Sequence, residues 1–309
     1  MFLFRAMFES TRERSRIYGV WILVFCSGIQ GCATTPYRYG HARAVQPIKS
    51  SPDDVEFEFG GPHPAMDRMR RVVEFPQRLL RGNKYQFAPE LSPGRRDQLA
   101  NYLSQNDLTD VRVLVNQYDP GGEWQRLKSN TRVAPGWRYT AGVLSVTSYT
   151  LLPGRVFGYQ HYNPYTETLS VNSDRVASAV HEAACAKDIH GRSLPGTYAT
   201  LTTLPCFRLW KTSRAVNDVL GYAQAEDDWE LESGTYREYF SQVASGIVRP
   251  AQYFLTPMVN VIVTFGGGAV GHVVGRVVEQ RRLAERQVEN QNSEAESPIQ
   301  TVDYSTTAE

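Results

Sequence analysis

The chain has 309 residues, a net charge of +1 and an ordinary share of apolar residues, 41%. This length suffices for one large domain or two small ones. A charge this close to zero gives no electrostatic reason to expect nucleic-acid binding. The sequence therefore predicts no nucleic-acid partner.

The N-terminus has the zones of a bacterial export signal. Four arginines lie within residues 1–16, and residues 17–29 carry no charge. The uncharged run has about the length of a signal-peptide core and is too short to span a bilayer comfortably. It leads into Ile-Gln-Gly-Cys at 29–32, which resembles a lipobox, although Gln30 departs from the small or aliphatic residue usual there.

We therefore expect residues 1–31 to be a signal peptide and Cys32 to be lipidated. These 31 residues carry a net charge of +2, so their removal changes the charge of the chain from +1 to −1. A diacylated cysteine supplies two chains, which is enough for stable binding to a lipid bilayer. Ala33 is not the aspartate that retains lipoproteins in the inner membrane, so the outer membrane is the expected location. The alternative is an uncleaved signal anchor in which Cys32 is an ordinary cysteine.

The predicted fold class is α+β, with a small sheet followed by a mostly helical half. Residues 32–65 lack a sustained period and are expected to form a tether. The domain is expected at 66–250, and the polar residues 284–309 are predicted to be disordered. Period-two patterns and β-branched or aromatic runs predict strands at 111–116, 137–149 and 167–172. Predicted helices are 66–80, 92–103, 174–188, 196–204, 212–226, 236–248 and 252–282.

The helix at 174–188 contains the sequence His181-Glu182-x-x-Cys185. Positions 181 and 185 are one helical turn apart and share a face, so an imidazole and a sulfur can reach one ion. Glu182 lies beside them, where a carboxylate could polarise a metal-bound water. This helix is therefore the candidate site for chemistry.

The segment 166–225 resembles the zincin metallopeptidases, whose helix carries His-Glu-x-x-His just after an edge strand. The resemblance implies a zinc cofactor, with His181 as the first ligand and Glu182 as the general base. It also implies that the strand at 167–172 aligns a peptide substrate. Cys185 stands where the second histidine is found in zincins, so the implied metal site is degenerate.

A zincin also needs a third metal ligand farther along the chain. Asp218 lies four residues before Tyr222, in a way similar to the aspartate-type zincins, and is the expected ligand; Glu226 is the second choice. Two of three ligand positions are then irregular, which argues against efficient hydrolysis. Two other roles for Cys185 stay open: a free buried thiol, or a disulfide with Cys206 in an oxidising compartment.

The most apolar part of the mature chain lies in a helix predicted at 251–283. Gly267, Gly271 and Gly275 recur at four-residue spacing, a stripe that lets another helix approach closely. The stretch 258–278 reaches the roughly 20 residues that a membrane span requires. Insertion into a membrane and packing on the protein's own core are both compatible with this pattern.

These observations predict a membrane-anchored envelope lipoprotein with a zincin-like domain and a degenerate metal site, with weak or lost peptide hydrolysis. The alternative, from a different class, is a non-enzymatic structural or scaffold lipoprotein that keeps the fold. The expected partners are the bilayer through Cys32, a peptide or protein substrate, and a helix that contacts the glycine stripe.

Overall fold

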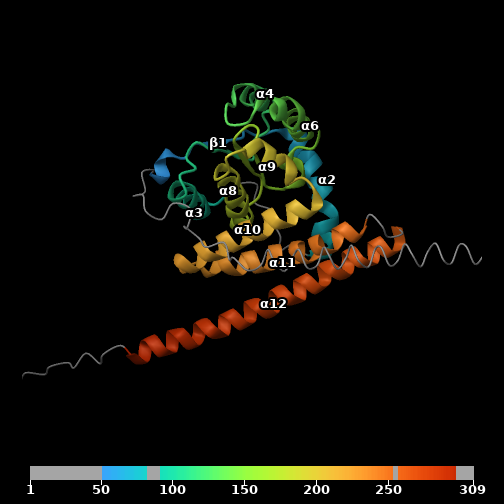
Figure 1. Cartoon of the computed structure of the whole chain (residues 1–309). Coiled ribbons are helices and arrows are strands. Elements are labelled where there is room, and N and C mark those ends of the chain that lie inside the picture. The colour runs from blue at the N-terminus through green and yellow to red at the C-terminus, as the bar shows by residue number, and fades with distance from the viewer. Residues whose placement is uncertain (1–50, 82–90, 253–256, 297–309) are drawn as a thin grey trace, which may run out of the picture. The chain divides into compact units, whose positions relative to one another are not determined.

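The structure is a computed structural model, and it describes residues 51–81, 91–252 and 257–296. The fold class is α+β, as predicted: a small four-stranded sheet accompanies a larger number of helices (Figure 1). The predicted signal peptide 1–31 and Cys32 lie outside the described residues. The helical elements are η1 (Pro52–Asp54), α2 (Pro64–Arg81), α3 (Pro93–Gln105), α4 (Pro120–Ser129), α5 (Pro135–Trp137), η2 (Arg138–Gly142), α6 (Val143–Leu151), α7 (Gly154–Phe157), α8 (Val176–His190), α9 (Pro195–Leu201), α10 (Pro205–Ala225), α11 (Trp229–Gln252) and α12 (Pro257–Glu296).

The sheet has the strand order β1-β2-β4-β3. β1 (Phe57–Phe59), β2 (Arg112–Val115) and β4 (Thr168–Val171) are parallel, whereas β3 (His161–Asn163) is antiparallel to β4. Every residue of β4 is buried, as expected for a strand that is covered on both faces. The predicted strands at 111–116 and 167–172 are confirmed, and β3 forms one edge of the sheet.

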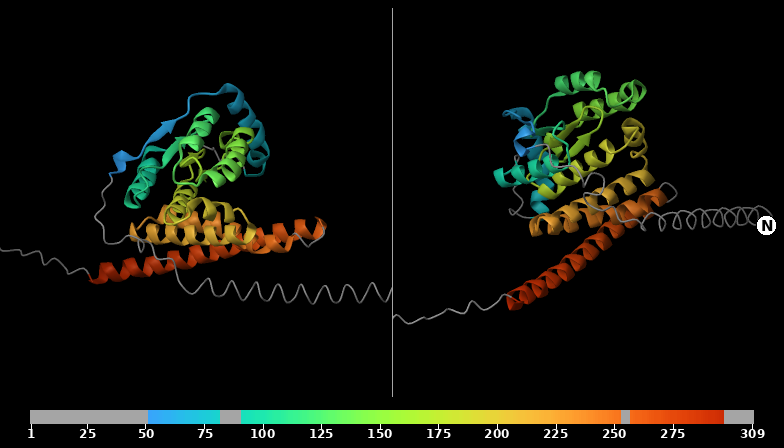
Figure 2. Two further views of the ribbon diagram at one scale, coloured as in Figure 1. Left: turned by 45° about the horizontal axis from the view of Figure 1, so that its top comes forward. Right: turned by 60° about the vertical axis from the view of Figure 1, so that its left-hand side comes forward.

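The helix α8 is the centre of the helical half. It contacts α3, α10 and α11 and is buried along most of its length. Alanines supply much of its surface, and small side chains let neighbouring helices approach closely: a Cβ at Gly234 of α11 would lie 3.2 Å from Cβ of Ala177. The views in Figure 2 show α10, α11 and α12 following one another on one side of the strands.

One predicted strand is wrong. Residues 137–149 form α5, η2 and α6 instead of a strand. Pro135 occupies the first turn, where its fixed φ favours a helix. The Thr140 hydroxyl donates to the carbonyl of Gly136 (2.7 Å), so this β-branched residue is satisfied within a helix. Val146 is fully buried, and tertiary packing has overridden the β propensity of the segment.

Two predicted boundaries are also corrected. The tether was expected over 32–65, but β1 at 57–59 belongs to the sheet, where Phe57 pairs with Val113. The domain therefore begins earlier than the sequence indicates. The disordered tail was expected from 284, but α12 continues to Glu296, and residues 297–309 lie outside the described part.

The glycine stripe of α12 packs on α11 of the same chain. Gly271 and Gly275 are buried, and a Cβ at Gly275 would lie 2.7 Å from the carbonyl oxygen of Tyr236. The burial of Gly267 lies outside what the structure describes. None of the helices in the described residues is both long enough and apolar enough to cross a membrane. The structure thus places Gly275 of the stripe in a helix contact within the protein.

Charged side chains extend the contact between α11 and α12. Glu232 of α11 is fully buried and lies within ion-pair distance of Arg282 (3.4 Å) and Arg286 (3.5 Å). Arg237 donates from Nε to both carboxylate oxygens of Glu279 at 3.0 Å. A buried carboxylate is costly unless it is paired, so these arginines fix the register of the two helices.

The substitution Gly275→Leu is expected to destabilise the protein by about 2 kcal/mol, because the new side chain would force α12 away from the backbone of Tyr236. Urea unfolding of the full chain, followed by circular dichroism, measures the loss. Val277→Leu is the matched control, since Val277 is 57% exposed on the same helix. Equal unfolding midpoints for the two variants would contradict the close helix contact.

Candidate metal centre

The helix α8 brings His181, Glu182 and Cys185 together as the sequence predicts. One ligand atom from each lies within 4.8 Å of the others, which is a group that could hold a metal ion. His181 is 4% exposed and Cys185 is 1% exposed, so the group sits deep in the fold. The spacing of one helical turn is the reason that the imidazole and the sulfur point the same way.

His181 lacks hydrogen-bond partners at both ring nitrogens. Its Nδ1 lies 3.4 Å from Oε1 of Glu182, close enough for an ion pair but without the geometry of a hydrogen bond. Its ring stacks on Tyr239 of α11, with centroids 4.0 Å apart and an interplanar angle of 18°. A buried polar atom without a partner is costly, so an imidazole left in this state is a strong indication of a ligand.

Glu182 is a carboxylate in this structure. Burial raises its pKa, but the polar interaction with the adjacent imidazole of His181, followed by electrostatic interactions with His161 and Lys211, outweighs burial and lowers the pKa to about 2. Its Oε2 accepts a hydrogen bond from the backbone N–H of Tyr162 at 3.0 Å. The charged form can either bind a cation or accept a proton from water.

Cys185 is a free, buried thiol. Of the two other roles considered for it, the structure agrees with the free buried thiol and not with a disulfide to Cys206. The side chain of Cys206 lies outside the described part. Burial raises the pKa of Cys185 well above its ordinary value. The sulfur is therefore neutral by itself, and a bound cation would have to displace its proton.

Asp218, the expected third ligand, is not part of this group. It is 1% exposed and binds Lys187 at 2.6 Å and the hydroxyl of Tyr102. Lys187 follows Cys185 by two residues, which places it about 200° around the helix from the metal-capable face. Glu226, the second choice, is exposed and accepts a hydrogen bond from Gln105. Neither predicted residue reaches the site.

The group lies on the wall of a cleft of about 1210 Å³. β3 borders this cleft, since His161 and Tyr162 line it together with His181, Glu182 and Cys185. The resemblance to zincins implied that the strand at 167–172 is the edge strand, but β4 is an interior strand. The edge strand beside the cleft is β3, one strand earlier in the chain.

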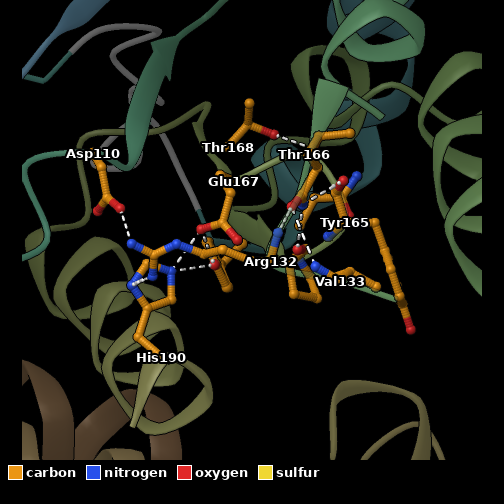
Figure 3. Close-up of polar contacts among 12 residues, drawn as sticks. Asp110, Arg132, Val133, Tyr165, Thr166, Glu167, Thr168 and His190 are labelled. Carbon is orange, nitrogen blue, oxygen red and sulfur yellow. Dashed lines mark hydrogen bonds and ion pairs between the residues drawn. The ribbon is translucent and has the colours of Figure 1, made fainter. Parts of the chain in front are cut away.

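The hairpin that carries β3 is attached to the end of α8 by a polar network (Figure 3). Glu167 has a φ of 56°, a strained value for a residue other than glycine, and His190 lies 2.6 Å from its carboxylate. Arg132 approaches Nδ1 of His190 at 2.8 Å and also binds Asp110. Because a guanidinium only donates, Nδ1 accepts and the Nε2–H donates to Glu167. The Tyr162 hydroxyl also donates to Glu167 (3.0 Å).

The chain was compared with family models, curated proteins and solved structures. The chain matches no family model, no curated protein and no solved structure. The assignment of the metal-capable group therefore depends on the geometry described above.

Several residues of the cleft were not predicted from the sequence. Tyr239 lies 58 positions after His181, and no sequence pattern connects the two. His161 is one of them, with its Nδ1 4.0 Å from Oε2 of Glu182. Arg208 and Lys211 of α10 also line the cleft. None of these residues belongs to the His-Glu-x-x-Cys sequence.

Asp218→Asn is expected to lower stability by about 3 kcal/mol without changing metal binding, because it removes one charge of a buried ion pair outside the site. Urea unfolding measures the stability, and zinc titration of the full chain measures metal binding. A lower zinc affinity in a folded Asp218→Asn protein would show that Asp218 is a ligand. Asp97→Asn is the control, because the side chain of Asp97 is 69% exposed.

Proposed function

We propose that this chain is a lipid-anchored envelope protein whose cleft binds zinc and an extended peptide, with weak or lost peptide hydrolysis. The observation that carries the proposal is the buried imidazole of His181, whose two nitrogens lack a hydrogen bond and lie beside a carboxylate and a thiol. A bound cation would give one of these nitrogens a partner. Zinc is the metal that best fits a site composed of nitrogen, sulfur and oxygen ligands.

The ligand set supports weak hydrolysis rather than efficient catalysis. With Asp218 paired elsewhere, the third protein ligand available is Glu182 itself. A carboxylate that binds the metal is not free to take a proton from water, which is the role that the zincin resemblance gives it. The thiolate of Cys185 would further reduce the positive charge on the metal. When bound, zinc would supply Lewis acidity at the wall of the cleft.

The edge strand supports a peptide as the ligand. β3 borders the cleft on the side of the metal-capable group, and it has one paired neighbour in the sheet, β4. An extended peptide can add to such an edge through main-chain hydrogen bonds. The cleft, at about 1210 Å³, has room for several residues of such a peptide.

The membrane anchor remains part of the proposal through the N-terminal sequence. The uncharged run at 17–29 and the Cys32 that follows support export and lipidation, and Ala33 supports sorting to the outer membrane. The tether, shortened by β1, would connect Cys32 to the domain.

A non-enzymatic scaffold is the second candidate. It is favoured by the hydrogen bond from Tyr162 to Glu182, which already uses the carboxylate that a peptidase needs as its base. In this case the cleft binds a partner peptide and the metal, if bound, has a structural role. Metal analysis and a peptidase assay on the same preparation separate the two functions.

Full-length protein purified in detergent is expected to contain about one zinc per chain by mass spectrometry of metals, because the group offers three protein ligands. His181→Ala and Cys185→Ser should reduce the zinc content to near background. His63→Ala is the control, at an exposed histidine outside the group. Folded protein that takes up no zinc on titration would refute the metal centre. Cys185→His, which restores the zincin motif, should bind zinc at least as tightly.

Mass spectrometry of the membrane fraction tests the anchor. In a bacterial host the mature chain is expected to begin at Cys32 with a lipid mass on that residue, and Cys32→Ala should abolish both cleavage and lipidation. Cys26→Ala, within the signal peptide, is the matched control and should be processed normally. A chain that retains Met1 in the membrane would instead support an uncleaved anchor.

A further inference from the structure

The cleft beside β3 carries an excess of positive charge. Arg175, Arg208 and Lys211 line it, whereas Glu182 is the sole carboxylate among its described lining residues. Arg175 has partners within the fold, since it donates to the carbonyl of Gly158 (3.3 Å) and to the Ser173 hydroxyl (3.4 Å). The charges that need an explanation are those of Arg208 and Lys211.

Arg208 and Lys211 both come from α10. They line the same cleft as β3, although they are far from β3 in the sequence. Among the described residues, neither side chain has a hydrogen bond or an ion pair, and their positions three residues apart place them on one face of the helix. Their charges act on the site: Lys211 contributes to the lowered pKa of Glu182 and opposes the raised pKa of Cys185.

The positive excess persists whether or not a metal is bound. With zinc present, two positive charges on the metal are balanced by the carboxylate of Glu182 and the thiolate of Cys185. With no metal, Cys185 is a neutral thiol and Glu182 balances only one of the two basic side chains. In both states Arg208 and Lys211 leave at least one uncompensated positive charge in the cleft.

We propose that the cleft selects acidic peptides, and that Arg208 and Lys211 bind a carboxylate of the peptide segment that lies along β3. The placement of the peptide rests on the proposed function. The selection of an acidic group follows from the charges on the cleft wall, because electrostatic complementarity determines which ligand enters such a site. Arg208 can hold a carboxylate through two parallel hydrogen bonds, and Lys211 adds a point charge.

Fluorescence anisotropy with three short labelled peptides tests this selection on the full chain in detergent, both chelator-treated and zinc-loaded. The peptides share one sequence except at two central positions, which hold glutamate, glutamine or lysine. The glutamate peptide is expected to bind about tenfold more tightly than the glutamine peptide at low salt, and the preference should shrink as salt rises.

Variants identify the residues responsible. The double variant Arg208→Gln with Lys211→Gln should abolish the preference for glutamate, whereas Lys211→Arg should retain it. Arg281→Gln is the control, at an exposed arginine of α12. Equal affinity for the glutamate and glutamine peptides, an unchanged preference in the double variant, or no binding of any peptide would each overturn the inference.

Comparing the chelator-treated and zinc-loaded protein tests this inference separately from the proposed metal centre. A chain that binds no zinc but still prefers the glutamate peptide refutes the metal centre alone. A chain that binds zinc and shows no preference refutes the acidic selection alone.

Discussion

The burial of α8 is the constraint on which the rest of the structure depends. An alanine-rich helix can pack against the sheet and the helices α3, α10 and α11 because its small side chains let their backbones approach. That position removes His181 and Cys185 from water while leaving their tips on a cleft wall. The same helix projects Lys187 to its other side, where it neutralises Asp218. One element therefore carries both the polar site and a structural ion pair.

Other buried polar groups on and beside this helix are paired. Asp188, near the end of α8, has Arg192 at 2.8 Å and Arg214 at 3.1 Å and receives a hydrogen bond from Tyr198. Asp218 likewise has two partners. The fold thus compensates these carboxylates where they only support structure. The imidazole of His181, which has no hydrogen bond at either nitrogen, contrasts with this pattern, and it belongs to the group that could hold a metal ion.

The sequence predicted the elements whose period was clear and failed where local composition misled. Strands β2 and β4 followed from the alternation of apolar and polar residues, and helix α8 followed from the helical pattern that begins at Asp174. The segment 137–149 looked like a strand because it is rich in β-branched and aromatic residues, yet proline and packing made it helical. Asp218 was predicted as a metal ligand because it lies four residues before Tyr222. In the structure its carboxylate pairs with Lys187, on the side of α8 away from the metal-capable group. Long-range contacts such as Tyr239 with His181 have no local signal.

Tyr162 of the edge strand β3 connects the metal-capable group with the polar network at the end of α8. Its amide is held by Glu182, and its hydroxyl by the carboxylate of Glu167. In the proposed function, a peptide that docks on β3 and takes this amide would release the Glu182 side chain, and a cation bound by that side chain would free the amide. Peptide binding and cation binding would then be coupled, and each would raise the affinity for the other by the same factor.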